Sequence, residues 1–118
     1  AEQGDDAAQV NLGVIYGNGR GVPRDYAEAM KWYLKAANQE DAYAQFNLAL
    51  MYARGRGVPQ DSVEALKWFI LAASNITDEA PANFNKEGGN IAAKMTPQQI
   101  AEAYGLARAW RPTGTATL

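Results

Sequence analysis

The chain has 118 residues, 47% of them hydrophobic, which suits one core and excludes two independent globular domains. Thirteen acidic and eleven basic residues give a formal charge of −2, and the scattered basic residues exclude the dense cationic face of a nucleic-acid-binding protein. The lack of Cys and His excludes disulfides, thiolate or imidazole catalysis and the usual zinc ligands, so we expect no cofactor or metal.

An internal repeat of 36 residues organises the chain. Residues 6–41 match the segment 36 positions later at seventeen identical positions. We therefore place repeat one at about 5–40 and repeat two at about 41–76. The same offset matches residues 1–5 to residues 37–41, so we expect the N-terminus to be the end of a preceding repeat in a longer protein.

The first helix of each repeat is predicted by apolar residues at three- and four-residue spacing, which places them on one helical face. These residues are Ala8, Leu12, Ile15 and Tyr16 in repeat one and Ala44, Leu48, Met51 and Tyr52 in repeat two. We expect this face to pack into the core.

A glycine-rich turn follows each first helix. It contains Gly-Arg-Gly at 19–21 and again at 55–57, and no P-loop Lys-Ser/Thr follows either copy. We interpret these glycines as positive-φ residues of a tight turn rather than as a phosphate cradle. Each turn leads into a capping box, which we prefer to a pair of catalytic carboxylates, at Asp25/Glu28 and Asp61/Glu64.

The second helix of repeat one is expected to begin at about Tyr26. Its core side combines small and large residues, which lets neighbouring helices interlock: Ala29, Trp32, Tyr33, Ala36 and Ala37. Trp32, Trp68 and Trp110 lie on such stripes, so we interpret them as core residues rather than as a platform for stacking a base or sugar.

The last third of the chain departs from the repeat. Residues 77–95 are predicted to form an irregular segment or a third helix, with Asp78 and Glu79 at its start rather than acting as a catalytic pair. Residues 112–118 are predicted to be a tail.

A C-terminal capping helix is predicted over residues 96–111. Thr96 can cap its N-terminus, Pro97 suits the first helical position and Gln99 completes a capping box. We expect this helix to cover the open end of the stack. Its predicted apolar stripe is Ile100, Ala103, Tyr104, Ala107 and Trp110.

Three segments of the first repeat form a recognisable pattern: Ala-x-x-x-Leu-Gly-x-x-Tyr at 8–16, Gly-x-Gly-Val-Pro-x-Asp at 19–25 and Ala-x-x-Trp-Tyr-x-x-Ala-Ala at 29–37. Together these segments resemble the Sel1-like repeat, a relative of the tetratricopeptide repeat. Residues 44–73 repeat the pattern with Ala49 in place of the first Gly, and residues 95–103 resemble the terminal helix common in bacterial members.

The resemblance implies an all-α fold, a right-handed superhelix of two helix pairs plus a C-terminal capping helix, that binds a protein or peptide without catalysis. Some cysteine-rich members have been associated with β-lactam binding, but this chain has no Cys to form their disulfides. A β-lactam-interacting protein or envelope-associated hydrolase is therefore kept only as an alternative. The resemblance favours a periplasmic or secreted bacterial protein, and a cytoplasmic location stays open.

The candidate binding surface lies opposite the core stripe of each first helix. By analogy with the tetratricopeptide arrangement, this face lines a concave groove, and its candidate partner-binding residues are Val10, Asn11, Val14, Tyr43, Phe46, Asn47 and Leu50. Apolar and aromatic residues suit a partner helix or an extended peptide, and the two Asn side chains are able to donate to a peptide backbone. The alternative is that these residues pack between adjacent first helices, and the sequence leaves both interpretations open.

The leading function is thus a non-catalytic protein-interaction scaffold, with a protein or peptide as partner and neither nucleic acid nor membrane insertion expected. Candidate contacts for anionic groups are Arg20, Lys35, Arg54 and Arg56, with solvated surface as the alternative. A structural role is the other alternative, in which the chain self-associates through its exposed N-terminal repeat.

Overall fold

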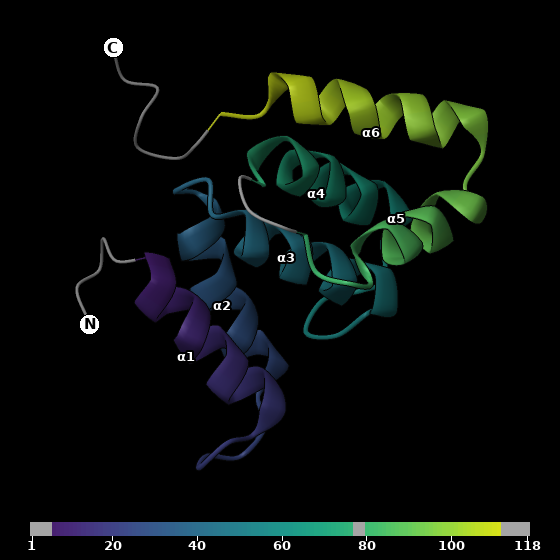
Figure 1. Cartoon of the computed structure of the whole chain (residues 1–118). Coiled ribbons are helices and arrows are strands. Elements are labelled where there is room, and N and C mark those ends of the chain that lie inside the picture. Colours follow the sequence, from purple (N-terminus) through teal and green to yellow (C-terminus); the bar gives the residue numbers. More distant parts are fainter. Residues whose placement is uncertain (1–5, 77–79, 112–118) are drawn as a thin grey trace.

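The computed structural model describes residues 6–76 and 80–111, which form six helices and no strand. The helices follow one another along the chain (Figure 1): α1 (Asp6–Asn18), α2 (Tyr26–Ala37), α3 (Ala42–Arg54), α4 (Ser62–Asn75), α5 (Phe84–Ala93) and α6 (Pro97–Ala109). The predicted all-α fold is confirmed. The expectations for residues 1–5, for Asp78 and Glu79 and for the tail 112–118 lie outside the described residues.

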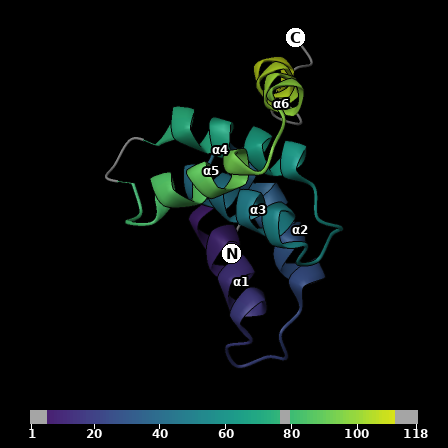
Figure 2. The same cartoon turned by 90° about the vertical axis from the view of Figure 1, so that its right-hand side faces the viewer.

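The helices stack in succession, with α1 against α2, α2 against α3 and α3 against α4. α6 then packs across α4, and α5 contacts α4 and α3 from another side (Figure 2). Small side chains fill the contacts between these helices. The alanines at the contacts are fully buried: Ala36, Ala37, Ala44, Ala49 and Ala65. The predicted interlocking of neighbouring helices therefore depends on alanine at these contacts.

α6 covers α4 with only part of its predicted stripe. Ala103 and Ala107 are buried, and the Trp110 ring meets the Trp68 ring edge-on at 5.7 Å between centroids. The prediction that Tyr104 faces the core is wrong, because its side chain is 47% exposed. α6 packs mainly on α4 and so buries a narrower stripe than a helix held between two neighbours.

The helix N-termini are capped as predicted, with one difference. Asp25 Oδ1 accepts a hydrogen bond from the Glu28 N–H at 3.0 Å, and repeat two makes the same bond. A full capping box would also need the Glu28 side chain to accept a hydrogen bond from the backbone N–H of Asp25. Instead, the Glu28 carboxylate pairs with Lys31 at 3.7 Å, because residues three apart on a helix are neighbours. At the start of α6, Thr96 and Gln99 make both bonds of a full capping box.

The glycines of the two turns have the predicted left-handed backbone. Their φ angles are +70° and +75° at Gly19 and Gly21 and +68° and +83° at Gly55 and Gly57. The second turn also closes on the first residue of α2, since a Cβ at Gly57 would lie 2.9 Å from the Tyr26 carbonyl oxygen. This contact brings the turn of repeat two against repeat one.

Two buried glutamines, which the sequence analysis did not identify, reinforce the stacking. Gln9 and Gln45 occupy equivalent positions and are 1% and 0% exposed. Gln39 Nε2 donates to Gln9 Oε1 at 2.7 Å, and Asn75 Nδ2 donates to Gln45 Oε1 at 3.0 Å. Gln45 Nε2 also donates to the Ala37 carbonyl at 3.2 Å, which joins α3 to the end of α2. A buried amide left unpaired would cost about 1–3 kcal/mol, so these bonds favour one stacking register.

A second core forms where α5 meets α3 and α4. The centroid of the Phe84 ring lies 5.0 Å from that of Phe46 and 4.4 Å from that of Phe69. α5 approaches this closely because Gly88 has no side chain, and a Cβ there would collide with the Phe69 ring. Of the two alternatives for residues 77–95, an irregular segment or a further helix, the structure thus has the helix. This helix, α5, covers the part of α3 around Phe46.

The two adjacent glycines of α5 give a matched test of this packing. Gly88→Ala should lower the free energy of unfolding by about 1–3 kcal/mol, because the Phe69 ring has to move. Gly89→Ala should raise it by about 0.5–1 kcal/mol, because a Cβ at Gly89 meets nothing within 4 Å and alanine favours helix. Urea unfolding of both variants checks this, and effects of the same sign would refute the observed docking of α5.

Tyr33 gives a test at high pH. Its ring packs against Gly13 and its side chain is 6% exposed, and this burial raises the pKa of the Tyr33 phenol above its ordinary value of 10.0. The folded state therefore favours the neutral phenol. Below about pH 10 the phenol is neutral in both states, whereas above it the unfolded chain ionises first, so stability falls as the pH rises.

Tyr33→Phe should make this alkaline loss of stability less steep, as measured by urea unfolding on both sides of about pH 10. Part of the loss should persist, because burial, and after it the carboxylates of Glu64 and Asp61, also raise the pKa of Tyr52. Tyr104→Phe is the matched control at an exposed site. Equal pH profiles for Tyr33→Phe and Tyr104→Phe would show that burial of Tyr33 has no such effect.

Candidate functional site

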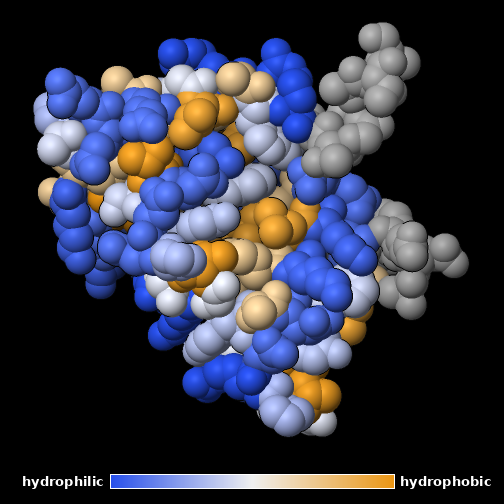
Figure 3. All heavy atoms as spheres, turned by 180° about the vertical axis from the view of Figure 1, so that it is seen from behind, coloured by the Kyte–Doolittle hydropathy of each residue, from blue (hydrophilic) through white to orange (hydrophobic). Residues whose placement is uncertain are grey.

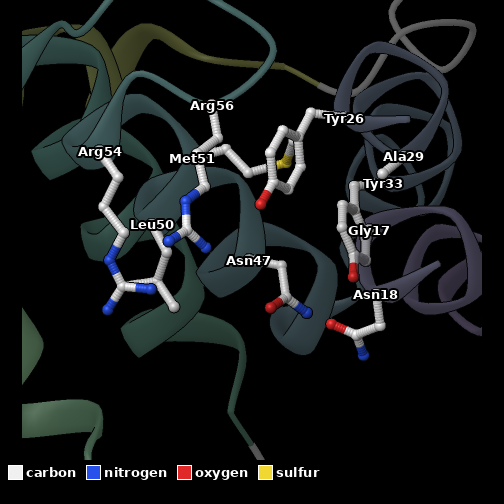
Figure 4. A pocket seen from close by; sticks show the side chains of 10 residues that line it. All are labelled: Gly17, Asn18, Tyr26, Ala29, Tyr33, Asn47, Leu50, Met51, Arg54 and Arg56. Carbon is white, nitrogen blue, oxygen red and sulfur yellow. The ribbon is translucent and has the colours of Figure 1, made fainter. Parts of the chain in front are cut away.

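A pocket of about 180 Å³ opens between the two repeats. Its lining residues come from α1, α2, α3 and the turn after α3 (Figure 4): Gly17, Asn18, Tyr26, Ala29, Tyr33, Asn47, Leu50, Met51, Arg54 and Arg56. The described lining thus combines apolar side chains with amide, phenol and guanidinium groups, and no carboxylate is among it. We refer to these residues as the inter-repeat pocket.

One wall of the inter-repeat pocket is built by repeat one. Gly17, near the end of α1, leaves room beside Ala29 of α2, where an added Cβ would lie 3.6 Å from the Ala29 Cβ. The Tyr33 ring is fixed against Gly13 in the same hairpin, and its hydroxyl group points toward Asn18 (Figure 4). The tight packing of α1 on α2 therefore determines the shape of this wall.

The opposite wall is one face of α3. Asn47, Leu50, Met51 and Arg54 follow the spacing of a single helical face, so α3 presents all four together. Asn47 is half-buried, and its side chain points into the space between the walls (Figure 4). No hydrogen bond joins the Asn47 amide to another of the described residues. A half-buried amide of this kind can both donate and accept.

The polar edge of the pocket is cationic. The Arg54 guanidinium pairs with the Glu87 carboxylate of α5 at 2.9 Å. Arg56 lies over the Tyr26 ring, with its guanidinium carbon 5.5 Å from the ring centroid, and Arg24 lies 5.6 Å from the same ring. Tyr26 therefore holds two guanidinium groups at the start of α2 by cation–π attraction.

The seven predicted partner-binding residues are not brought together. Asn47 and Leu50 line the inter-repeat pocket. Val10 and Val14 are half-buried and pack on the main core, whereas Asn11 and Tyr43 are exposed outside the pocket. Phe46 is 6% exposed and contacts rings of α4 and α5, so it is a packing residue, but on these two helices and not between adjacent first helices as the alternative stated. Phe46 is buried because α5 covers this part of α3.

Asn18 and Tyr26 of the pocket were not predicted as site residues. Repeat two carries Arg54 and Ser62 at the equivalent positions, so the two repeats differ here as they do at the predicted groove. The predicted groove was placed by helical periodicity on one face of the first helices, which does not extend to residues beside the turns. Of the four cationic candidates, Arg54 and Arg56 line the pocket, and Arg20 and Lys35 do not.

Other parts of the described surface offer less chemistry. On the face opposite that of Figure 1, hydrophilic side chains surround separate apolar patches (Figure 3). A shallow apolar depression lies between α4, α5 and α6, with Phe69, Ile70 and Tyr104 in its walls. The described residues contain no cluster of acidic side chains that could hold a metal ion, and none of their helices is long and apolar enough to cross a membrane.

Comparison with known proteins identifies the repeat. Residues 6–41 and 42–75 each match the Sel1 repeat family. No curated protein sequence matches the chain.

Solved structures give the same result. The chain is 34% identical to c5321, a protective antigen present in uropathogenic Escherichia coli strains displaying an SLR fold, with a TM-score of 0.82 over 91% of this chain and 22% of that one. It is also 34% identical to a Sel1 repeat protein from Oxalobacter formigenes, with a TM-score of 0.68 over 91% of this chain and 44% of that one. The chain thus spans less than half the length of either relative, and its two matched repeats show that it belongs to the Sel1 repeat family.

Proposed function

We propose that this chain is a protein-interaction module that takes an extended segment of its partner into the inter-repeat pocket. Sel1 repeat proteins commonly serve as interaction scaffolds and are typically non-enzymatic. The proposal goes further, because it assigns binding to one pocket and gives roles to Asn47 and Leu50 of α3.

The single observation that supports the proposal most strongly is the Asn47 side chain. It is half-buried in the pocket, and no hydrogen bond joins it to another of the described residues. An extended peptide presents a backbone N–H and C=O, which one amide side chain can pair with simultaneously. Leu50 and Met51, on the same face of α3, supply an apolar wall for a side chain of the bound segment.

The size of the pocket favours a peptide over a small-molecule ligand. Sites for drug-sized ligands usually enclose about 300–1,000 Å³. The inter-repeat pocket has about 180 Å³, which suits one side chain with its adjoining backbone. A partner protein can anchor one residue here and gain further contacts along the surface on either side.

Affinity selection from a synthetic library of short random peptides tests the proposal, followed by calorimetric titration of the peptides retained. Asn47→Ala should weaken binding about thirtyfold, because two hydrogen bonds worth about 1 kcal/mol each are lost. Asn11→Ala is the matched control, since Asn11 is the equivalent residue of repeat one and is exposed outside the pocket.

Circular dichroism of both variants should match that of the parent chain, so that a change in affinity reports the site. If the parent chain retains no peptide, or if Asn47→Ala binds as tightly as Asn11→Ala, the inter-repeat pocket is not the binding site.

A further inference from the structure

The charge of the inter-repeat pocket differs in sign from that of the whole chain. The chain carries a formal charge of −2, whereas the charged residues in the described lining are Arg54 and Arg56. Because electrostatic potentials across an interface tend to be complementary, a positively charged pocket favours a negatively charged ligand.

The two arginines are not equivalent. The Arg54 guanidinium is already paired with Glu87 at 2.9 Å. Among the described residues, no carboxylate lies within ion-pairing distance of Arg56. The carboxylates that begin the two neighbouring helices are occupied, since Asp25 and Asp61 accept hydrogen bonds from backbone N–H groups of their own helices.

Tyr26 holds Arg56 in place at the pocket. The guanidinium lies over the ring, 5.5 Å from its centroid, and its nitrogens enter the space beside Leu50 and Asn47 (Figure 4). A guanidinium held near a ring by cation–π attraction still has N–H groups available for a bidentate hydrogen bond. Two such N–H groups match the two oxygens of a carboxylate.

We infer that the segment bound in the inter-repeat pocket carries a carboxylate that pairs with Arg56, next to an apolar residue that packs on Leu50. This inference rests on the proposed function and specifies its ligand as an acidic peptide. A nucleic acid fits less well, because recognition of its backbone requires many cationic groups to neutralise the phosphates. In the described lining, Arg54 is already paired with Glu87, which leaves the guanidinium of Arg56.

The carboxylate can come from an Asp or Glu side chain or from a free C-terminus, and two libraries distinguish these sources. Short random peptides with amidated C-termini and the same peptides with free C-termini are selected on the parent chain and sequenced by mass spectrometry. Enrichment of Asp or Glu in the amidated library indicates a side chain. Retention of free-terminus peptides alone indicates the terminal carboxylate. Both outcomes support the inference.

A matched pair of variants assigns the effect to Arg56. Arg56→Gln should weaken binding of the selected peptide about tenfold, as loss of a charge-assisted hydrogen bond predicts. Arg20→Gln is the control, because Arg20 is the equivalent residue of repeat one and does not line the pocket. Added salt should also weaken binding to the parent chain more than binding to Arg56→Gln.

Equal retention of amidated and free-terminus peptides with no enrichment of Asp or Glu would overturn the inference. So would equal binding of the selected peptide by Arg56→Gln and Arg20→Gln. The proposed function would survive either result if Asn47→Ala still weakened binding. Failure of the parent chain to retain any peptide would instead overturn the proposed function itself.

Discussion

The close packing of α3 against both α2 and α4 is the constraint on which the rest of the structure depends. Ala44, Leu48 and Ala49 of α3 are fully enclosed, so no larger side chain fits without separating the helices. Gln45 fixes the position of α3 relative to both neighbours, because its two hydrogen bonds reach the end of α2 and the end of α4. With α3 fixed in this way, its next face is held at a set distance from α2, and the inter-repeat pocket lies in the space between them.

α5 explains why the two repeats, so similar in sequence, offer different surfaces. Phe84 and Gly88 fit α5 onto the aromatic rings of α3 and α4, and Glu87 adds an ion pair with Arg54. The surface of repeat two around Phe46 is therefore occupied by the chain itself. The Asn47 side of the same helix, where α3 faces repeat one, stays open to a ligand.

The sequence predicts the parts of this structure that recur at the 36-residue offset. The helix pairs, the positive-φ glycines and the aspartate caps all occupy equivalent places in both repeats, so each copy supports the other. The docking of α5 could not be predicted, because Phe84 and Gly88 have no counterpart in the repeats and their fit depends on a ring, Phe69, from another helix. The candidate site was predicted in part, since helical periodicity places Asn47 and Leu50 on one face but does not say which neighbour covers Phe46.

The central claim is that a partner binds between the repeats and not over α5. Solution NMR of the isotopically labelled chain with a selected peptide tests it most directly, through nuclear Overhauser contacts from the peptide to assigned side chains. The account predicts contacts to the Asn18 and Asn47 amides and to the Leu50 methyl groups, with the Phe84 ring signals unchanged. Peptide contacts to Phe46 or Phe69, or shifts that report release of Phe84, would contradict the account and place recognition on the surface that α5 covers.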